Sequence, residues 1–213
     1  GAALVLLALV ADNSSFARAI ALALHLMNTL LLLGALTLTA WFAGGNAPIR
    51  LRNQGRLPMV LGIGLLGTAI VGATGAVTAL GDTLLLLGAL PGDITQPFAP
   101  NSHPLVQLRI WHPVLGLLMT IYGWFLARTA SVERSDDPRT QRFAWAFIAR
   151  MFAQVAVGCG NVTLKAPVPM QLFHLFMADL VWMALVLLSA AALADPSAET
   201  ETRTVVSRAP VGV

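Results

Sequence analysis

Charged residues are scarce in this chain of 213 residues. They make up only 11% of it, whereas an ordinary soluble domain carries roughly a quarter. Hydrophobic residues reach 57%, and the mean hydropathy is +0.76. This balance excludes an ordinary soluble enzyme and indicates a protein with several membrane-spanning segments. The formal net charge of +3 is small, so the composition gives no support to nucleic acid binding.

Cysteine is nearly absent as well. Cys159 is the only one, so the chain cannot form an internal disulfide, and one thiol is too few for a structural zinc or iron–sulfur site. The chain also begins without Met or a charged segment and enters "GAALVLLALV" directly after Gly1, unlike a signal peptide. We therefore expect residues 1–10 to be the end of a helix, and the chain to be part of a longer protein.

Long apolar runs dominate the rest of the chain. A bilayer core of about 30 Å requires roughly 20 apolar residues per helix, and a backbone in lipid must satisfy its own hydrogen bonds. The sequence therefore predicts an all-α, polytopic transmembrane bundle. The five runs are residues 17–43, 57–80, 105–128, 142–163 and 168–194.

Arginine is concentrated in two of the connections, and positive charge marks the cytoplasmic side of a membrane protein. We expect both connections to be cytoplasmic, together with a disordered C-terminal tail, and we expect a bacterial plasma membrane location. The arginines are Arg50, Arg52 and Arg56 in the first connection, and Arg128, Arg134, Arg139 and Arg142 in and beside the second.

The histidines fall into two groups. His103 lies in a connection, whereas His25, His112 and His174 each lie roughly 9–12 Å along a helix that enters from the outer side. A lone histidine in a membrane helix is usually a hydrogen-bonded core residue, but a shared depth favours a functional site. Imidazoles from facing helices are typical haem ligands. Zinc is disfavoured, because no thiolate or carboxylate lies at ligand spacing.

Other residues refine this hypothesis. Arg109 lies one helical turn before His112, so it could face the propionates of a haem, or it could be an interfacial arginine that extends to the headgroups. Five glycines between positions 62 and 75 would admit a neighbouring helix or a flat ligand. Arg150 and Asp179 lie at similar depths, and we expect them to form a structural ion pair.

An internal similarity suggests two related halves. "HLMNTLLLLGALTL" from His25 aligns with "HLFMADLVWMALVL" from His174. This predicts that further helices precede Gly1 and carry the partner of His25. The predicted divisions are 1–43, the end of an N-terminal four-helix half; 44–56, a cytoplasmic loop; 57–194, a C-terminal four-helix haem-binding half; and 195–213, the tail.

Four stretches resemble the haem A synthase family of membrane enzymes. They are "HLMNTLLLLGALTLTAWF", "LLGTAIVGATGAVTALGDTL", "SHPLVQLRIWHP" and "APVPMQLFHLFMADLVWMALVLL". The resemblance implies eight helices in two halves, with haem b held by His112 and His174 and the iron of the substrate haem held by His25. It places the catalytic residues before Gly1, and Cys159 does not match the family's paired loop cysteines.

The resemblance implies oxidation of the C8 methyl of haem O towards haem A, for cytochrome oxidase biogenesis. The expected partners are haem O, membrane lipid, and haem O synthase or cytochrome oxidase assembly proteins. We expect the chain alone to bind haem b without completing catalysis. Two alternatives remain open: a bis-histidine electron-transfer cytochrome, and a structural or assembly bundle whose histidines only form hydrogen bonds.

Overall fold

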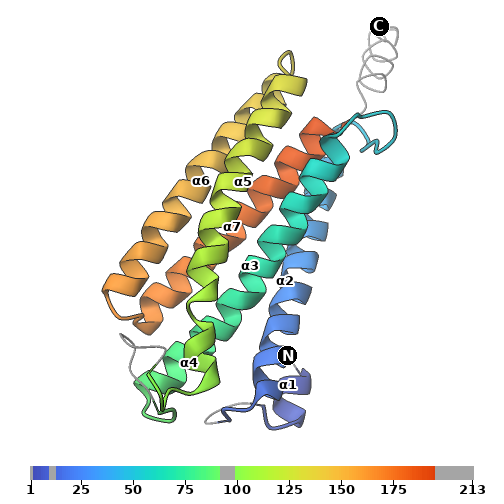
Figure 1. Cartoon of the computed structure of the whole chain (residues 1–213). Coiled ribbons are helices and arrows are strands. Elements are labelled where there is room, and N and C mark those ends of the chain that lie inside the picture. The colour runs from blue at the N-terminus through green and yellow to red at the C-terminus, as the bar shows by residue number, and fades with distance from the viewer. Residues whose placement is uncertain (1, 10–12, 92–98, 195–213) are drawn as a thin grey trace, which may run out of the picture.

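The computed structural model describes residues 2–9, 13–91 and 99–194, which form helices joined by short connections (Figure 1). These residues contain no β-strand, and five helices are long and apolar enough to cross a membrane. The all-α membrane fold is therefore confirmed. The helices are α1 (Ala2–Leu6), α2 (Phe16–Ala43), α3 (Leu57–Leu86), α4 (Pro104–Leu108), α5 (Trp111–Glu133), α6 (Pro138–Thr163) and α7 (Val168–Ala192).

Helices α3, α5, α6 and α7 pack in a closed ring, each against two neighbours, and α2 packs on the outside against α3 and α7. The short α4 lies at one end of the bundle, with the start of α2 and the turn between α6 and α7 (Figure 1). The other end carries the 44–56 loop and the turn between α5 and α6. We call these the α4 end and the loop end.

Local signals in the sequence explain where the helices begin. The side chain of Ser15 accepts a hydrogen bond from the Arg18 amide at the start of α2. Asp137 begins α6 by accepting from the amides of Arg139 and Thr140 and from the Thr140 hydroxyl. Partial burial raises the pKa of the Asp137 carboxyl, but these hydrogen bonds outweigh burial, so its pKa lies below the usual value.

The predicted span 105–128 is interrupted near its start. The helix ends at Leu108 and resumes at Trp111, which divides it into α4 and α5. Pro113 accounts for this break, because it has no amide hydrogen for the carbonyl of Arg109 and its ring crowds that carbonyl. Helix α3 differs too, since it continues to Leu86 and not to residue 80. The predicted disordered tail, 195–213, lies outside the described residues.

Packing is densest at the loop end, and a smaller buried cluster lies at the α4 end. The main cluster of buried side chains joins the beginnings of α3 and α6 to the last turns of α5 and α7, with Leu126, Phe147 and Leu185 at most 1% exposed. In contrast, no residue is fully buried in the described segments 70–79, 111–122, 152–163 and 168–180. The main core therefore stops about halfway along α5, α6 and α7, whereas Leu84 of α3 packs with Leu105 and Val106 in a second cluster at the α4 end.

Candidate functional site

His112 of α5 and His174 of α7 face each other in the less densely packed half of the bundle. Their ring centroids are 6.1 Å apart, and the ring planes are perpendicular. Both side chains are half-buried. Because a metal–imidazole bond is about 2 Å long, this distance leaves room for one metal ion between the rings.

Each imidazole lies against a glycine on a neighbouring helix. A Cβ atom on Gly75 of α3 would lie 2.9 Å from Cε1 of His112, and one on Gly158 of α6 would lie 3.1 Å from Cε1 of His174. Both are closer than ordinary contacts, so a larger residue would push the ring aside. The α3 glycines thus include one that makes room for His112, while Gly67 and Gly72 approach Met119 of α5 and Leu30 of α2.

The hydrogen bonds of His112 define its ring orientation. Its Nδ1 lies 3.1 Å from the Val71 carbonyl oxygen and 3.3 Å from the Thr74 hydroxyl. Because a carbonyl oxygen can only accept, Nδ1 of His112 carries the hydrogen. Nε2 then keeps a free lone pair, which is the arrangement found in metal-binding histidines.

His174 has different surroundings. Its Nε2 lies 3.2 Å from the side-chain nitrogen of Gln154, one turn before Gly158 on α6, and its Nδ1 is buried without a hydrogen-bond partner. An amide hydrogen of Gln154 can therefore occupy the Nε2 lone pair. A metal bound to this nitrogen would have to displace the Gln154 side chain.

Further buried polar atoms without partners lie on the same helix faces. They are Thr78 Oγ1, one turn after Thr74 on α3, and Gln154 Oε1 and Asn161 Oδ1, which flank Gly158 on α6. Leaving such atoms unsatisfied in a membrane bundle is costly, and a ligand with polar groups would satisfy them. The incomplete packing, the facing glycines and these polar atoms together fit a flat, mostly apolar ligand that has a few polar groups.

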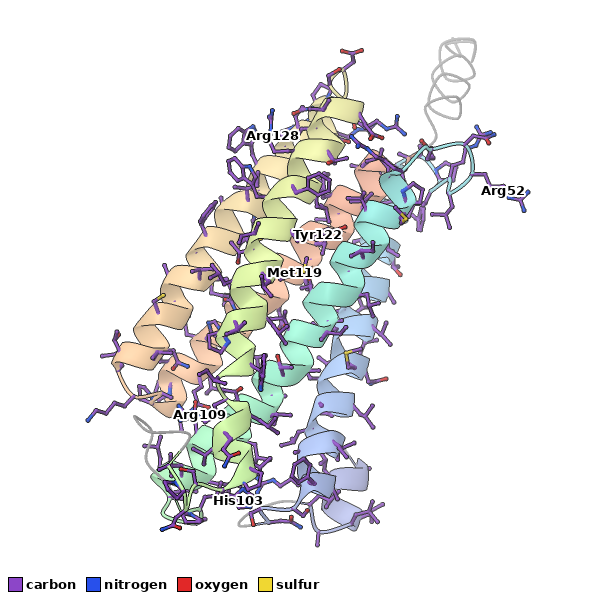
Figure 2. The ribbon with its side chains drawn as sticks, in the orientation of Figure 1. Arg52, His103, Arg109, Met119, Tyr122 and Arg128 are labelled. Atoms are coloured by element: carbon purple, nitrogen blue, oxygen red, sulfur yellow. The ribbon has the colours of Figure 1, made fainter. Side chains whose placement is uncertain are left out.

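Arg109 lies at the α4 end of this polar stripe, in the break between α4 and α5 (Figure 2). Its guanidinium forms an ion pair with Asp82, which lies one turn beyond Thr78 on α3 and is 4% exposed. The sequence analysis missed Asp82, because the predicted span ended at residue 80. Arg109 therefore already holds one carboxylate, and its contact with a propionate stays a prediction.

The expected ion pair between Arg150 and Asp179 is wrong. Arg150 donates to the Ala146 carbonyl of its own helix at 3.0 Å, and Asp179 Oδ1 is buried without a hydrogen-bond partner. A similar depth in the membrane did not predict whether these two side chains meet. Five residues separate Asp179 from His174, a rotation of about 140° around the helix, so Asp179 does not share the face on which His174 meets α6.

The remaining histidines are not part of this pair. His103 accepts from the Leu105 amide at 3.2 Å and thereby caps the start of α4 (Figure 2). His25 is exposed, and it lies outside the stripe through which α2 packs, which includes Ala19, Leu30 and Gly34. Among the described residues, no group of three histidine, cysteine or acidic side chains could hold a metal ion.

Sequence reasoning missed Thr74, Gln154 and Gly158, which lie against the two imidazoles. A usable signal existed for Gln154, because an amide side chain in a membrane helix needs a hydrogen-bonding partner. Glycine and threonine are common in membrane helices, so neither Gly158 nor Thr74 stands out.

The fold and this site define a membrane helical bundle with a pair of facing imidazoles in the half nearer the α4 end. Comparison with known proteins agrees with this class. The chain belongs to the COX15-CtaA family, described as cytochrome oxidase assembly protein, whose family model matches residues 1–186. The family resemblance in the sequence is thereby confirmed.

Curated relatives also match the chain. Two proteins called protoheme IX farnesyltransferase, from two strains of Thermus thermophilus, are each 42% identical over 193 residues. The match covers 91% of this chain but 32% of each relative, so the chain spans about a third of the length of these proteins. No solved structure matches the chain.

Proposed function

We propose that His112 and His174 would together hold the iron of a haem b. The observation that carries this proposal is the pair of imidazoles, 6.1 Å apart and each beside a glycine, in the part of the bundle without a dense core. The free Nε2 of His112 suits iron, and the absence of a third metal-binding side chain among the described residues argues against zinc.

We propose further that the longer protein oxidises the C8 methyl of haem O towards haem A during cytochrome oxidase assembly. Family membership supports this role, and the relatives' name places them in haem modification as well. His25 would bind the iron of the substrate haem on the exposed face of α2. The catalytic residues are expected before Gly1, and haem O synthase is the expected partner.

The residues of this chain would bind and orient the haem. His112 and His174 would hold the iron, which supplies one-electron chemistry when the haem is bound. Gly75 and Gly158 leave space beside the rings, and the membrane excludes bulk water. Arg109 and Asp82, at the α4 end, would form the polar boundary of the site. We propose that this end faces outward and that the loop end and C-terminus face the cytoplasm.

A second function is supported by one observation. The described residues contain one facing pair of histidines, which is sufficient for a membrane electron-transfer cytochrome that oxidises no porphyrin. Haem extracted from cells with and without the full-length protein distinguishes the two functions. The appearance of haem A supports the oxidase, whereas bound haem b without haem A supports the cytochrome.

Absorption spectra test the ligands directly. We expect His112→Ala and His174→Ala each to abolish the low-spin bis-histidine spectrum of the purified protein, because each removes one axial ligand. His103→Ala is the control and should retain the spectrum, since His103 only caps α4. A wild-type protein without a Soret band after haem supply would contradict both haem functions and favour a structural bundle.

A further inference from the structure

The two imidazoles of the site differ in their hydrogen-bond partners. Nδ1 of His112 faces two oxygen atoms, those of Val71 and Thr74, whereas Nδ1 of His174 is buried and has no hydrogen-bond partner. Identical residues in a symmetric site would have similar surroundings. The difference indicates that the groups around His112 do more than provide space for a ring.

Thr74 is the side chain that contributes to this difference, beside the backbone carbonyl of Val71. Its hydroxyl donates to the Val71 carbonyl at 2.8 Å and lies 3.3 Å from Nδ1 of His112. Since the hydroxyl hydrogen points to Val71, an oxygen lone pair is left to accept the Nδ1 hydrogen. The Nδ1–H group is therefore shared between the Val71 carbonyl and the Thr74 hydroxyl, and both favour the same tautomer.

From this geometry we propose that Thr74 is a positioning residue that fixes the Nδ1–H tautomer of His112 and strengthens Nε2 as a donor to iron. This role rests on the proposed haem ligation. A histidine whose second nitrogen donates to an acceptor is a more basic ligand, and more basic ligands stabilise ferric over ferrous iron. Thr74 would thereby lower the reduction potential of the haem and favour transfer of an electron from the reduced haem to an acceptor.

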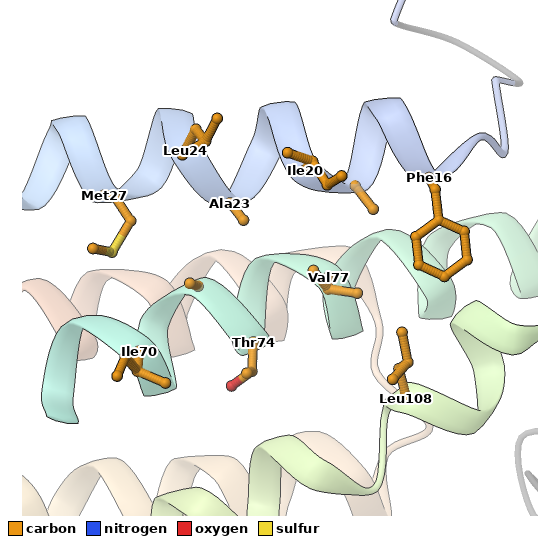
Figure 3. A pocket seen from close by; sticks show the side chains of 11 residues that line it. Phe16, Ile20, Ala23, Leu24, Met27, Ile70, Thr74, Val77 and Leu108 are labelled. Atoms are coloured by element: carbon orange, nitrogen blue, oxygen red, sulfur yellow. The ribbon is translucent and has the colours of Figure 1, made fainter.

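The surroundings of Thr74 make a selective variant possible. Thr74 lies at the wall of a groove of about 320 Å³ between α2 and α3, whose other lining residues are apolar. Figure 3 shows its side chain on the side of α3 away from α2, between Ile70 and Val77. Valine keeps the shape of threonine, so Thr74→Val removes the hydroxyl without opening a cavity.

The test uses the haem-loaded chain and the same chain without haem. We expect Thr74→Val to raise the reduction potential and to weaken ferric haem binding by roughly 10-fold, the lower end for loss of a group that orients a ligand. In the haem-free chain, nitrogen NMR should show His112 with its hydrogen on Nδ1. That population should fall in Thr74→Val, because the Nδ1 hydrogen then has one of its two acceptors, the Val71 carbonyl, left.

Two matched variants separate tuning from general destabilisation. Thr74→Ser restores a hydroxyl and should return the potential and the tautomer towards wild type. Thr37→Val makes the same chemical change on α2, outside the site, where the hydroxyl donates to the Leu33 carbonyl of its own helix, and it should change neither quantity.

The inference is overturned if Thr74→Val binds haem but leaves the potential and tautomer at wild-type values, or if Thr37→Val causes the same shifts. It is also overturned if wild-type His112 carries its hydrogen on Nε2. A wild-type chain with the Nδ1–H tautomer but no haem absorption would support the hydrogen bonding and contradict the proposed haem function alone.

Discussion

Asp179 and Asp82 show how differently two carboxyl groups can be placed in one membrane bundle. Asp82 is buried and forms an ion pair with Arg109, whereas Asp179 on α7 has one buried oxygen that lacks a hydrogen-bond partner. An ion pair at low dielectric constrains both partners, and removing one leaves the other charge buried alone. Asp179 imposes no such constraint, because no cation is paired with it.

These two environments predict opposite results for the same substitution. We expect Asp179→Asn to change the free energy of unfolding by less than about 1 kcal/mol, since it keeps the side-chain shape and removes no ion pair. Asp82→Asn should cost about 3–5 kcal/mol, because Arg109 loses its buried partner. Thermal unfolding in detergent measures both, and equal losses would contradict this assignment.

For single side chains, the sequence indicated which residues are unusual in a membrane helix better than it indicated which side chains they contact. Depth along the helices placed His25, His112 and His174 in one layer, because helix rise depends only on residue number, and the structure brings the last two face to face. It failed for Arg150 and Asp179, because a contact also requires the right side of each helix. The partners of His112 depend on how α3 rotates against α5, which hydropathy does not encode.

Helix α3 lies close to its neighbours through its glycines, and the closest backbone approach is at Gly81. A Cβ atom there would lie 2.9 Å from the backbone carbonyl oxygen of Leu105 in α4. Backbone cannot move aside as a flexible side chain can. The position of α4 over the end of α3 therefore depends on the absence of a side chain at Gly81.

Alanine substitutions along α3 test this contact. Gly81→Ala should destabilise the protein by about 1–3 kcal/mol, because the new methyl group displaces α4. Gly62→Ala is the control, since open space surrounds Gly62, and its higher helix propensity should stabilise the helix by up to about 1 kcal/mol. Similar melting temperatures for the two variants would show that α4 does not lie against Gly81.

The helices themselves could be predicted closely, because a bilayer imposes a minimum length on every apolar run. The break between α4 and α5 could not, although Pro113 lies just after it. Average hydropathy is unchanged by a missing amide hydrogen, so a span can be long and apolar and still contain an interruption.

Both arginine-rich connections lie at the loop end, where they contact each other and the end of α7 (Figure 1). Arg56 forms an ion pair with Glu133 at 2.7 Å, and Arg139 donates to Asn46 at 3.0 Å. Arg134 donates to the Ala192 carbonyl at 2.9 Å. The prediction that the two connections share one side of the membrane therefore fits the structure, while the side they face stays a prediction.

Cysteine labelling in membrane vesicles tests the orientation. In a Cys159→Ser background, Asn53→Cys and Ser135→Cys should react with an impermeant thiol reagent only from the cytoplasmic side. Asn101→Cys, near α4, should react only from the opposite side. Labelling of Asn53→Cys and Asn101→Cys from the same side would contradict the bundle orientation, and reversed labelling would contradict the rule of positive inner loops.

The main core ends midway along α5, α6 and α7, and this affects how easily the ends of these helices move. Local opening is easiest where few side chains are buried, so the ends of α5, α6 and α7 near the histidines should open at a lower free energy than the loop end. The histidine-bearing ends could then separate far enough to admit a rigid planar molecule while the loop end stays closed. Entry would require local breathing of the helix ends and no unfolding of the chain.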